Sequence, residues 1–295
     1  MKQEKEYQER EAANWSILKY FERSPAHARE AIKTRGFPPS DAQKLGTITH
    51  DAVLSPKTFS QKYFVLPPFG WRKNEEKEAF VDKCIIEWNL LKAADKEKAV
   101  KLKKDQIIDY IQTRSGRTLI EDFIFQNAMK ISKAVWANPH AKQLLESAEM
   151  IEEPIYWTDK ETGAPCKARI DAYTHKVGKK EVNCLIDLKT CRNAKYNAFQ
   201  SDLAKWEYPC QMAHYKDAIE SLRHKVERVV LIAVEAAPPY GVMCYPLSLS
   251  DISIATITVK EYLKQYKYCM DNDHWPCYPA EFENISPPEW WYKKH

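Results

Sequence analysis

The spacing of apolar and polar residues predicts helices through the first half of the chain. In segment 40–54, Leu45, Ile48 and Ala52 recur at the spacing of one helix face. An earlier helix is expected to begin at Ser24, because serine side chains cap helix N-termini and a proline follows. Further helices are predicted over residues 5–22, 75–93, 118–136 and 138–147. Between them lie a Pro-rich crossing at 63–70 and a lysine-rich stretch at 92–104. The lysine-rich stretch is expected to be either a loop or an exposed helix.

The pattern changes near residue 150, where short apolar runs bounded by turn residues predict strands. These runs cover residues 152–158, 166–174, 182–190, 228–237 and 241–247. Helices are predicted over 195–206 and 210–223, between the third and fourth strands, and over 251–270. Strands that alternate with helices indicate an α/β core, which an N-terminal helical layer precedes.

We expect one compact unit rather than two independent domains. Residues 1–14 are predicted to form a charged helix or arm. Residues 15–270 are predicted to form a single domain, with a helical part at 15–147 and the α/β core at 148–270. Residues 271–295 are a tail rich in proline and aromatic residues, which either docks a partner or covers apolar core.

Composition and charge argue against some classes of protein but do not identify the function. Hydrophobic residues make up 44% and charged residues 29% of the chain, as in folded soluble proteins, and the formal net charge is only +4. None of the eight cysteines forms a C-x-x-C pair, which argues against a zinc ribbon or an iron–sulfur cluster. The start of the chain lacks an apolar signal segment, and the longest apolar run, near 229–234, is too short to span a membrane. We therefore expect a cytoplasmic protein with free thiols and no membrane partner.

Three charged residues, Asp171, Asp187 and Lys189, lie inside two runs that otherwise look buried. Alternate residues of a strand face the same side, so Asp187 and Lys189 share a face, and antiparallel pairing of the two runs would bring Asp171 close to Asp187. Two adjacent carboxylates repel each other unless a cation joins them, and oxygen ligands suit Mg²⁺ or Mn²⁺. A nearby lysine can steer a water or stabilise charge on a phosphate, so this spacing favours metal-dependent phosphodiester hydrolysis. The simpler alternative is an exposed strand that carries an ion pair.

Two further pairs of residues have helical spacing. Gln211 and Tyr215 lie at i and i+4 on one face of the helix that follows the Asp-x-Lys strand. Gly46 and His50 have the same spacing in segment 40–54. Glycine inside a helix costs about 1 kcal/mol relative to alanine, so its presence suggests that another backbone comes close and that His50 points to a metal. Each pair alone is weak, because such pairs are usually ordinary helix faces.

In the order G-x-x-x-H, D, D-x-K and Q-x-x-x-Y, these residues resemble the PD-(D/E)xK nuclease superfamily, in particular its RecB-like branch. Longer blocks resemble the nuclease domain of the RecE, or exonuclease VIII, family: "SPAH", "LGTITHDAVLSPKTF", "CKARIDAY", "IDLKT" and "YPCQMAHYKDAI". The resemblance covers residues 15–270 and implies a central mixed sheet flanked by helices. Ile170 stands where the superfamily name has proline, a departure common in the RecB-like branch.

The resemblance implies a role for each matching residue. The metal ligands would be His50, Asp171, Asp187 and the backbone carbonyl of Leu188. Lys189 would orient the attacking water, and Gln211 and Tyr215 would position the site or the scissile phosphate. Glu153, or its neighbour Glu152, is a candidate for an extra carboxylate. Two Mg²⁺ ions per site, replaceable by Mn²⁺, are expected, and no iron–sulfur cluster.

The activity that the resemblance implies is digestion of linear double-stranded DNA from its 5′ ends. This leaves 3′ single-stranded overhangs for recombination by single-strand annealing, as in phage. The implied partners are DNA ends, a RecT-like annealing protein and further copies of the chain in a ring, with four subunits favoured over three. The basic residues that are candidates for lining the DNA channel are Lys33, Arg35, Arg72, Lys73, Arg192, Lys195 and Lys205.

Two other functions remain open from the sequence. One is a different enzyme on the same fold, an endonuclease or a Cas4-like nuclease. The other is a catalytically dead DNA-binding ring protein, against which the complete set of motif residues argues.

Overall fold

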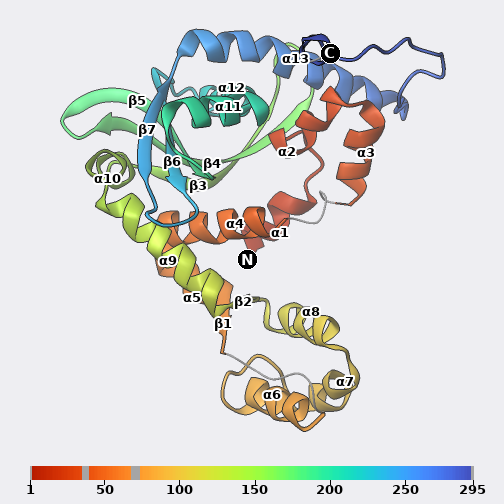
Figure 1. The fold of residues 1–295 in the computed structure, drawn as a ribbon, viewed down its shortest axis with the longest axis vertical. Helices are drawn as coiled ribbons and strands as arrows, with labels where there is room; N and C mark the ends of the chain where they lie inside the picture. The colour runs from red at the N-terminus through yellow and green to blue at the C-terminus, as the bar shows by residue number, and fades with distance from the viewer. Residues whose placement is uncertain (1, 35–39, 68–73, 294–295) are drawn as a thin grey trace. The chain divides into compact units, whose positions relative to one another are not determined.

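The computed structural model describes residues 2–34, 40–67 and 74–293 (Figure 1). Contacts divide the chain into two compact units. The terminal unit comprises Met1–Phe37, Thr158–Cys166 and Val259–His295, and the sheet unit comprises Pro38–Trp157 and Lys167–Thr258. Residues of the predicted domain at 15–270 fall in both units, and the extent of that domain stays a prediction.

A five-stranded sheet forms the centre of the sheet unit, in the order β3-β4-β5-β6-β7. Its strands are β3 (Met150–Thr158), β4 (Pro165–Val177), β5 (Lys180–Cys191), β6 (Arg228–Glu235) and β7 (Val242–Leu247). β4 pairs with β5 antiparallel, β5 with β6 parallel, and β6 with β7 antiparallel. The predicted α/β class, with a mixed sheet flanked by helices, is confirmed.

Helices cover both faces of this sheet. Figure 1 shows α4 (Asp41–Leu54) and α9 (Asp122–Ala137) on one side, and α11 (Tyr196–Lys205) and α12 (Tyr208–Ser221) on the other. α10 (Pro139–Glu146) and the first face share one apolar core, which includes Ile186 and Leu188 of β5. The Asp187 side chain lies between these two residues on β5, so it faces away from this core, as strand alternation requires.

Local sequence explains where α4 begins. The Ser40 hydroxyl accepts a hydrogen bond from the Gln43 backbone N–H at 3.3 Å, and the Gln43 side-chain oxygen accepts one from the Ser40 N–H at 2.8 Å. This capping box satisfies two backbone donors that a helix start otherwise leaves unpaired. At the other end of the helix, the Ser132 hydroxyl of α9 donates to the Ala52 carbonyl at 3.1 Å. α4 is thus held at both ends.

Two sequence predictions fail at a small parallel sheet. The predicted crossing at 63–70 contains strand β1 (Tyr63–Leu66), and the predicted helix 118–136 starts only at Asp122, because Thr118–Glu121 forms β2. Aromatic and β-branched residues favour strands, but each strand needs a partner more than fifty residues away, which local periodicity cannot reveal. Residues 68–70 of the predicted crossing lie outside the described residues.

The sheet unit also contains helices with a separate apolar core. These are α6 (Asn74–Ile86), α7 (Lys96–Lys101) and α8 (Lys104–Ser115). Phe59 of α5 (Pro56–Lys62) belongs to a different cluster, which includes Ile48 of α4. Phe80, Val81, Ile107 and Ile111 belong to a buried cluster that α6 and α8 share. The lysine-rich stretch 92–104 forms a short 3-10 turn, Ala93–Asp95, followed by α7.

The terminal unit is built from short helices. They are α1 (Lys2–Glu9), α2 (Trp15–Leu18), a 3-10 turn (Lys19–Glu22), α3 (Pro25–Lys33), the second part of α13 (Leu249–Asn272) and α14 (Glu289–Tyr292). The predicted helix 5–22 is therefore broken, because Ala13 forms a parallel bridge with Cys166. Ser24 caps α3 as predicted, by accepting the His27 backbone N–H. None of the described helices is long and apolar enough to cross a membrane.

Candidate active site

The β4–β5 pairing brings the two predicted aspartates together. Ala172 lies opposite Ile186, so the antiparallel register continues with Asp171 across from Asp187. Asp187 in turn lies beside Leu231 of the buried strand β6. The site therefore begins at the centre of the sheet, where neighbouring strands fix both backbones.

The Asp187 carboxylate is buried without a hydrogen bond. Its side chain is only 1% exposed, and neither oxygen accepts a hydrogen bond from the described residues. The Lys189 ammonium lies 2.5 Å from Oδ2 and forms an ion pair with it. Burial raises the pKa of Asp187 to about 6, which Lys189 opposes and Asp171 reinforces. The lysine therefore offsets the cost of burying this carboxylate only in part.

Asp171 has two partners. Its Oδ2 accepts a hydrogen bond from the Leu188 backbone N–H at 2.7 Å and lies 3.3 Å from Nδ1 of His50. Burial alone would raise the pKa of Asp171, but the charge of His50 holds it below the ordinary value. Burial likewise would lower the pKa of His50, but Asp171 outweighs it and the pKa rises to about 9. The predicted histidine on α4 thus reaches the predicted aspartate on β4.

Glu152, on β3, supplies a third carboxylate. Its Oε2 lies 3.1 Å from Nε of Arg169, and burial followed by repulsion from Asp171 raises the pKa of Glu152 to about 7. Its backbone has φ of 52°, in the left-handed region that non-glycine residues seldom occupy. Glu153, which the sequence analysis favoured, is exposed. Strand alternation could not show which of the two glutamates faces the site, because the unusual φ at Glu152 interrupts the alternation.

Lys189 is held by three groups. Its ammonium donates to Oε1 of Gln211 at 2.9 Å, lies beside Asp187, and sits 4.9 Å from the centre of the Tyr208 ring. Gln211 in turn donates from Nε2 to the Tyr215 hydroxyl at 3.0 Å. The predicted Gln211–Tyr215 pair therefore orients the lysine, with the amide oxygen toward the ammonium. Tyr208, which the sequence analysis did not single out, packs on the other side of that ammonium.

These residues fit a divalent cation. Ligand atoms of His50, Glu152 and Asp171 lie within 4.8 Å of one another, and Asp187 is outside this group of three. Burial, reinforced by repulsion from Asp171, raises the pKa values of Asp187 and Glu152, and a divalent cation would offset that repulsion. The Leu188 N–H points to Asp171. Because the N–H and C=O of one strand residue point toward the same neighbouring strand, the Leu188 carbonyl is directed toward β4 as well.

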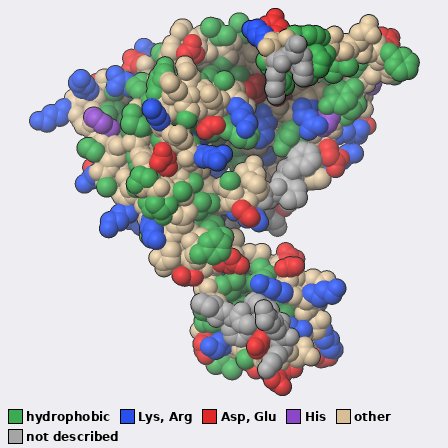
Figure 2. Space-filling model, viewed as in Figure 1, with side chains coloured by type: hydrophobic (Ala, Val, Ile, Leu, Met, Phe, Trp, Pro, Cys, Tyr) green, Lys and Arg blue, Asp and Glu red, His purple; other side chains and the backbone are tan. Residues whose placement is uncertain are grey.

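The structure describes only some of the basic residues that were predicted to contact DNA. Arg192, Lys195 and Lys205 are exposed at or near α11, directly after the strand that carries Asp187 and Lys189. Arg72 and Lys73, like Arg35, lie outside the described residues, and Lys33 ends α3 in the terminal unit. On the face that Figure 2 shows, Lys and Arg side chains are mixed with Asp and Glu side chains. That face therefore has no continuous basic band among its described residues.

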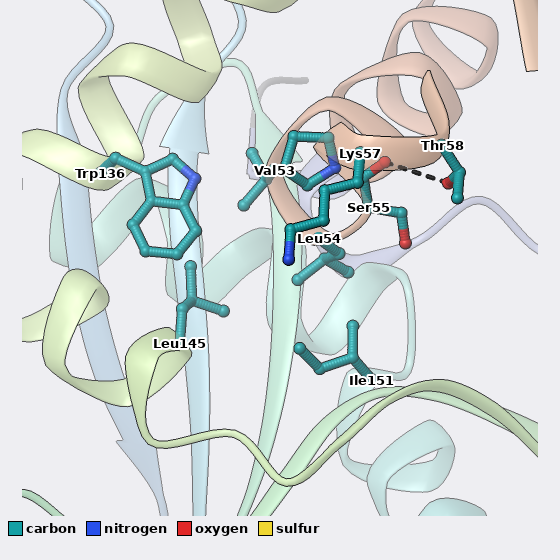
Figure 3. A pocket seen from close by; sticks show the side chains of 9 residues that line it. Val53, Leu54, Ser55, Lys57, Thr58, Trp136, Leu145 and Ile151 are labelled. Carbon is teal, nitrogen blue, oxygen red and sulfur yellow. Dashed lines mark hydrogen bonds between the residues drawn. The ribbon is translucent and has the colours of Figure 1, made fainter. Parts of the chain in front are cut away.

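A cavity of about 410 Å³ borders the elements that carry the cluster. Figure 3 shows Trp136, Leu145 and Ile151 facing Val53 and Leu54 across it. Its lining also includes Ser55, Pro56, Lys57 and Thr58. Ile151 precedes Glu152, and Leu54 follows His50 by about one helical turn, but no metal-ligand candidate lines the cavity. The cavity is therefore mainly apolar in its lining and is distinct from the cluster of metal-ligand candidates.

Gly46→Ala is expected to lower hydrolysis several-fold. A Cβ at Gly46 would lie 3.1 Å from the Thr190 hydroxyl, which is a tight contact, and a shift of α4 away from β5 to relieve it would carry His50 along. Removing the hydroxyl with Thr190→Ala in the same chain should restore the rate. Initial rates of the single and double variants measure the coupling. If the Thr190 hydroxyl simply rotates away, Gly46→Ala would instead keep full activity and gain about 1 kcal/mol of stability from helix propensity.

A match to a protein family agrees with this geometry. A family described as "PDDEXK-like domain of unknown function (DUF3799)" matches residues 14–286. Among solved structures, the chain is similar to a "Putative exonuclease" from Eubacterium rectale, at 12% identity over 92% of this chain and 89% of that chain, with a TM-score of 0.49. It is also similar to SSO0001, at 14% identity over 73% of this chain and 85% of that chain, with a TM-score of 0.27. The comparison with curated proteins gives no match.

Proposed function

Because the chain belongs to the family described as PDDEXK-like domain of unknown function (DUF3799), we propose that it is a metal-dependent exonuclease of double-stranded DNA. The predicted PD-(D/E)xK superfamily is confirmed by this match, and with it the coarser function of a hydrolytic nuclease. The observation that supports an active enzyme most directly is the chain of contacts from Tyr215 through Gln211 and Lys189 to Asp187. A lysine oriented beside a buried carboxylate by two further side chains supports a catalytic role over DNA binding alone.

The metal would be held by His50, Glu152, Asp171 and Asp187, with the Leu188 carbonyl as a further oxygen. Oxygen-rich ligands with one imidazole suit Mg²⁺, with Mn²⁺ as a substitute. When bound, the cation supplies Lewis-acid polarisation of the scissile phosphate and offsets its charge. Two ions per site are proposed.

The protein's own groups would position the reactants. Gln211 fixes the Lys189 ammonium through its amide oxygen, and the Tyr208 ring limits the space on the other side. From there Lys189 Nζ can donate a hydrogen bond to the attacking water and stabilise charge on the phosphate oxygens. Tyr215 holds the Gln211 amide in the orientation that this requires. Geometry of this kind lowers the barrier because the donors are in place before the charge develops.

The finer features of the proposal rest on the RecE resemblance. They are attack from 5′ ends to leave 3′ overhangs, a role in recombination with a RecT-like annealing protein, and a ring of four subunits rather than three. A ring would replace tight DNA binding by a topological link, which agrees with a net charge of only +4.

The test compares two forms of one duplex, a linear molecule labelled at each 5′ or 3′ end and a covalently closed circle, with Mg²⁺. We expect loss of the linear form from its 5′ ends while the circle stays intact. Cutting of the circle would support the endonuclease alternative. Absence of hydrolysis with Mg²⁺ or Mn²⁺ by folded protein would support the DNA-binding alternative, and loss from 3′ ends would overturn the proposed direction.

A further inference from the structure

Helix α11 carries two large aromatic side chains that the fold does not bury. Tyr196, its first residue, is 61% exposed, and Trp206, directly after its last residue, is 54% exposed. Phe199 between them is buried. Exposed tyrosine and tryptophan present large aromatic faces on which a planar ligand can stack.

A series of ring contacts connects this helix to the catalytic lysine. Tyr196 packs edge-on against Tyr245 at 6.3 Å, Tyr245 stacks on Phe199 at 5.2 Å, and Phe199 contacts Tyr208 at 6.0 Å. Tyr208 then lies 4.9 Å from Lys189 Nζ. The Tyr245 hydroxyl also donates to the Ala194 carbonyl at 2.6 Å. α11 is therefore a fixed support, with Trp206 only two residues from the tyrosine that touches Lys189.

Positive charge accompanies the exposed aromatics. Arg192 and Lys195 precede α11, and the Lys205 ammonium lies 4.7 Å from the centre of the Trp206 ring. Asp202 and Glu207 are the acidic residues of this segment, and both are half-buried. Aromatic faces interleaved with exposed cations suit a single nucleic-acid strand, in which bases stack and phosphates seek positive charge.

We propose that α11 seats unpaired nucleotides of the DNA beside the scissile bond, with bases stacked on Trp206 and Tyr196. Lys205, Lys195 and Arg192 contact the phosphates of the same strand. This inference rests on the proposed nuclease function and adds to it a subsite for single-stranded DNA. The two aromatics are ten positions apart, about 15 Å along a helix, which matches about four nucleotides at the ~3.4 Å spacing of stacked bases.

Direct binding tests the proposal without hydrolysis. A short fluorescein-labelled oligothymidylate is titrated with the full chain in EDTA, and fluorescence anisotropy is recorded. We expect Trp206→Leu to weaken binding roughly 10-fold, because stacking on an aromatic ring is lost. Trp206→Phe, which keeps an aromatic face, should recover most of the affinity. Trp290→Leu, which alters another exposed tryptophan in the terminal unit, is the matched control and should change nothing.

Other outcomes overturn the proposal. Equal affinity of Trp206→Leu and the wild type would mean that no base stacks there. If Trp206→Leu alters the oligomeric state measured by light scattering but leaves oligothymidylate binding intact, the aromatics cover a second copy of the chain instead. The proposed function fails separately: a protein that hydrolyses no DNA can still show Trp206-dependent binding, and an active exonuclease can lack it.

Discussion

Asp187→Asn is expected to abolish hydrolysis and to weaken divalent-cation binding, while making the metal-free protein more stable at neutral pH. The first two effects follow from removing the charge that would face the cation. The third follows from burial, which raises the pKa of Asp187 to about 6 from an ordinary value of 3.8. Above that raised pKa, the folded protein must hold a poorly compensated carboxylate that the unfolded chain exposes to water.

The coupling between protonation of Asp187 and folding determines the pH range in which stability changes. The folded state binds the Asp187 proton more tightly than the unfolded state, so stability falls as pH rises from about 4 to about 6 and the penalty is complete above that. Two pKa units correspond to at most about 3 kcal/mol. Asparagine cannot ionise, so the melting temperature of Asp187→Asn should exceed that of the wild type at pH 8 but not at pH 4.

Calorimetry separates the two parts of this prediction. Titration with Mn²⁺ measures the loss of affinity, and thermal unfolding in EDTA at both pH values measures stability. Asp202→Asn, which alters a half-buried carboxylate on α11, is the control and should leave Mn²⁺ affinity unchanged. Wild-type Mn²⁺ affinity in Asp187→Asn would remove this residue from the metal site.

Much of the site could be predicted from strand and helix periodicity. Asp187 and Lys189 share a strand face, and Gln211 and Tyr215 share a helix face, so each pair follows from one element alone. The approach of Asp171 to Asp187 required only that consecutive strands pair antiparallel. Short-range spacing therefore determined the parts of the site that lie within one element or across one hairpin.

The parts that were not predicted depend on contacts distant in sequence. β1 and β2 form strands only because they pair with each other. Phe199 of α11 is buried because Tyr245 of β7 stacks on it and Tyr208 of α12 contacts it. Tyr196 and Trp206, at the two ends of the helix, stay exposed. Packing from other elements, which helical spacing does not reveal, thus decides which aromatic side chains of α11 are exposed.

Lys189→Ala is expected to lower the hydrolysis rate by about 100-fold or more while keeping the fold and cation binding. Lys189 donates to Gln211 and lies beside Asp187, but it ligates nothing itself. Its loss removes a positioned donor and leaves the carboxylates in place. Asp187→Asn and Lys189→Ala should therefore differ in Mn²⁺ affinity although both are nearly inactive.

A matched lysine keeps this test specific. Lys216 lies on the same helix as Gln211 but pairs with Glu220 at 2.8 Å, away from the site residues. Lys216→Ala should retain wild-type hydrolysis, measured as initial rates on linear duplex at saturating Mg²⁺. Hydrolysis by Lys189→Ala within a few-fold of the wild type would show that the water is oriented by another group. Loss of Mn²⁺ binding in Lys189→Ala would mean that the lysine supports the geometry of Asp187, so its contribution to the rate would act through the metal ligands rather than through the water.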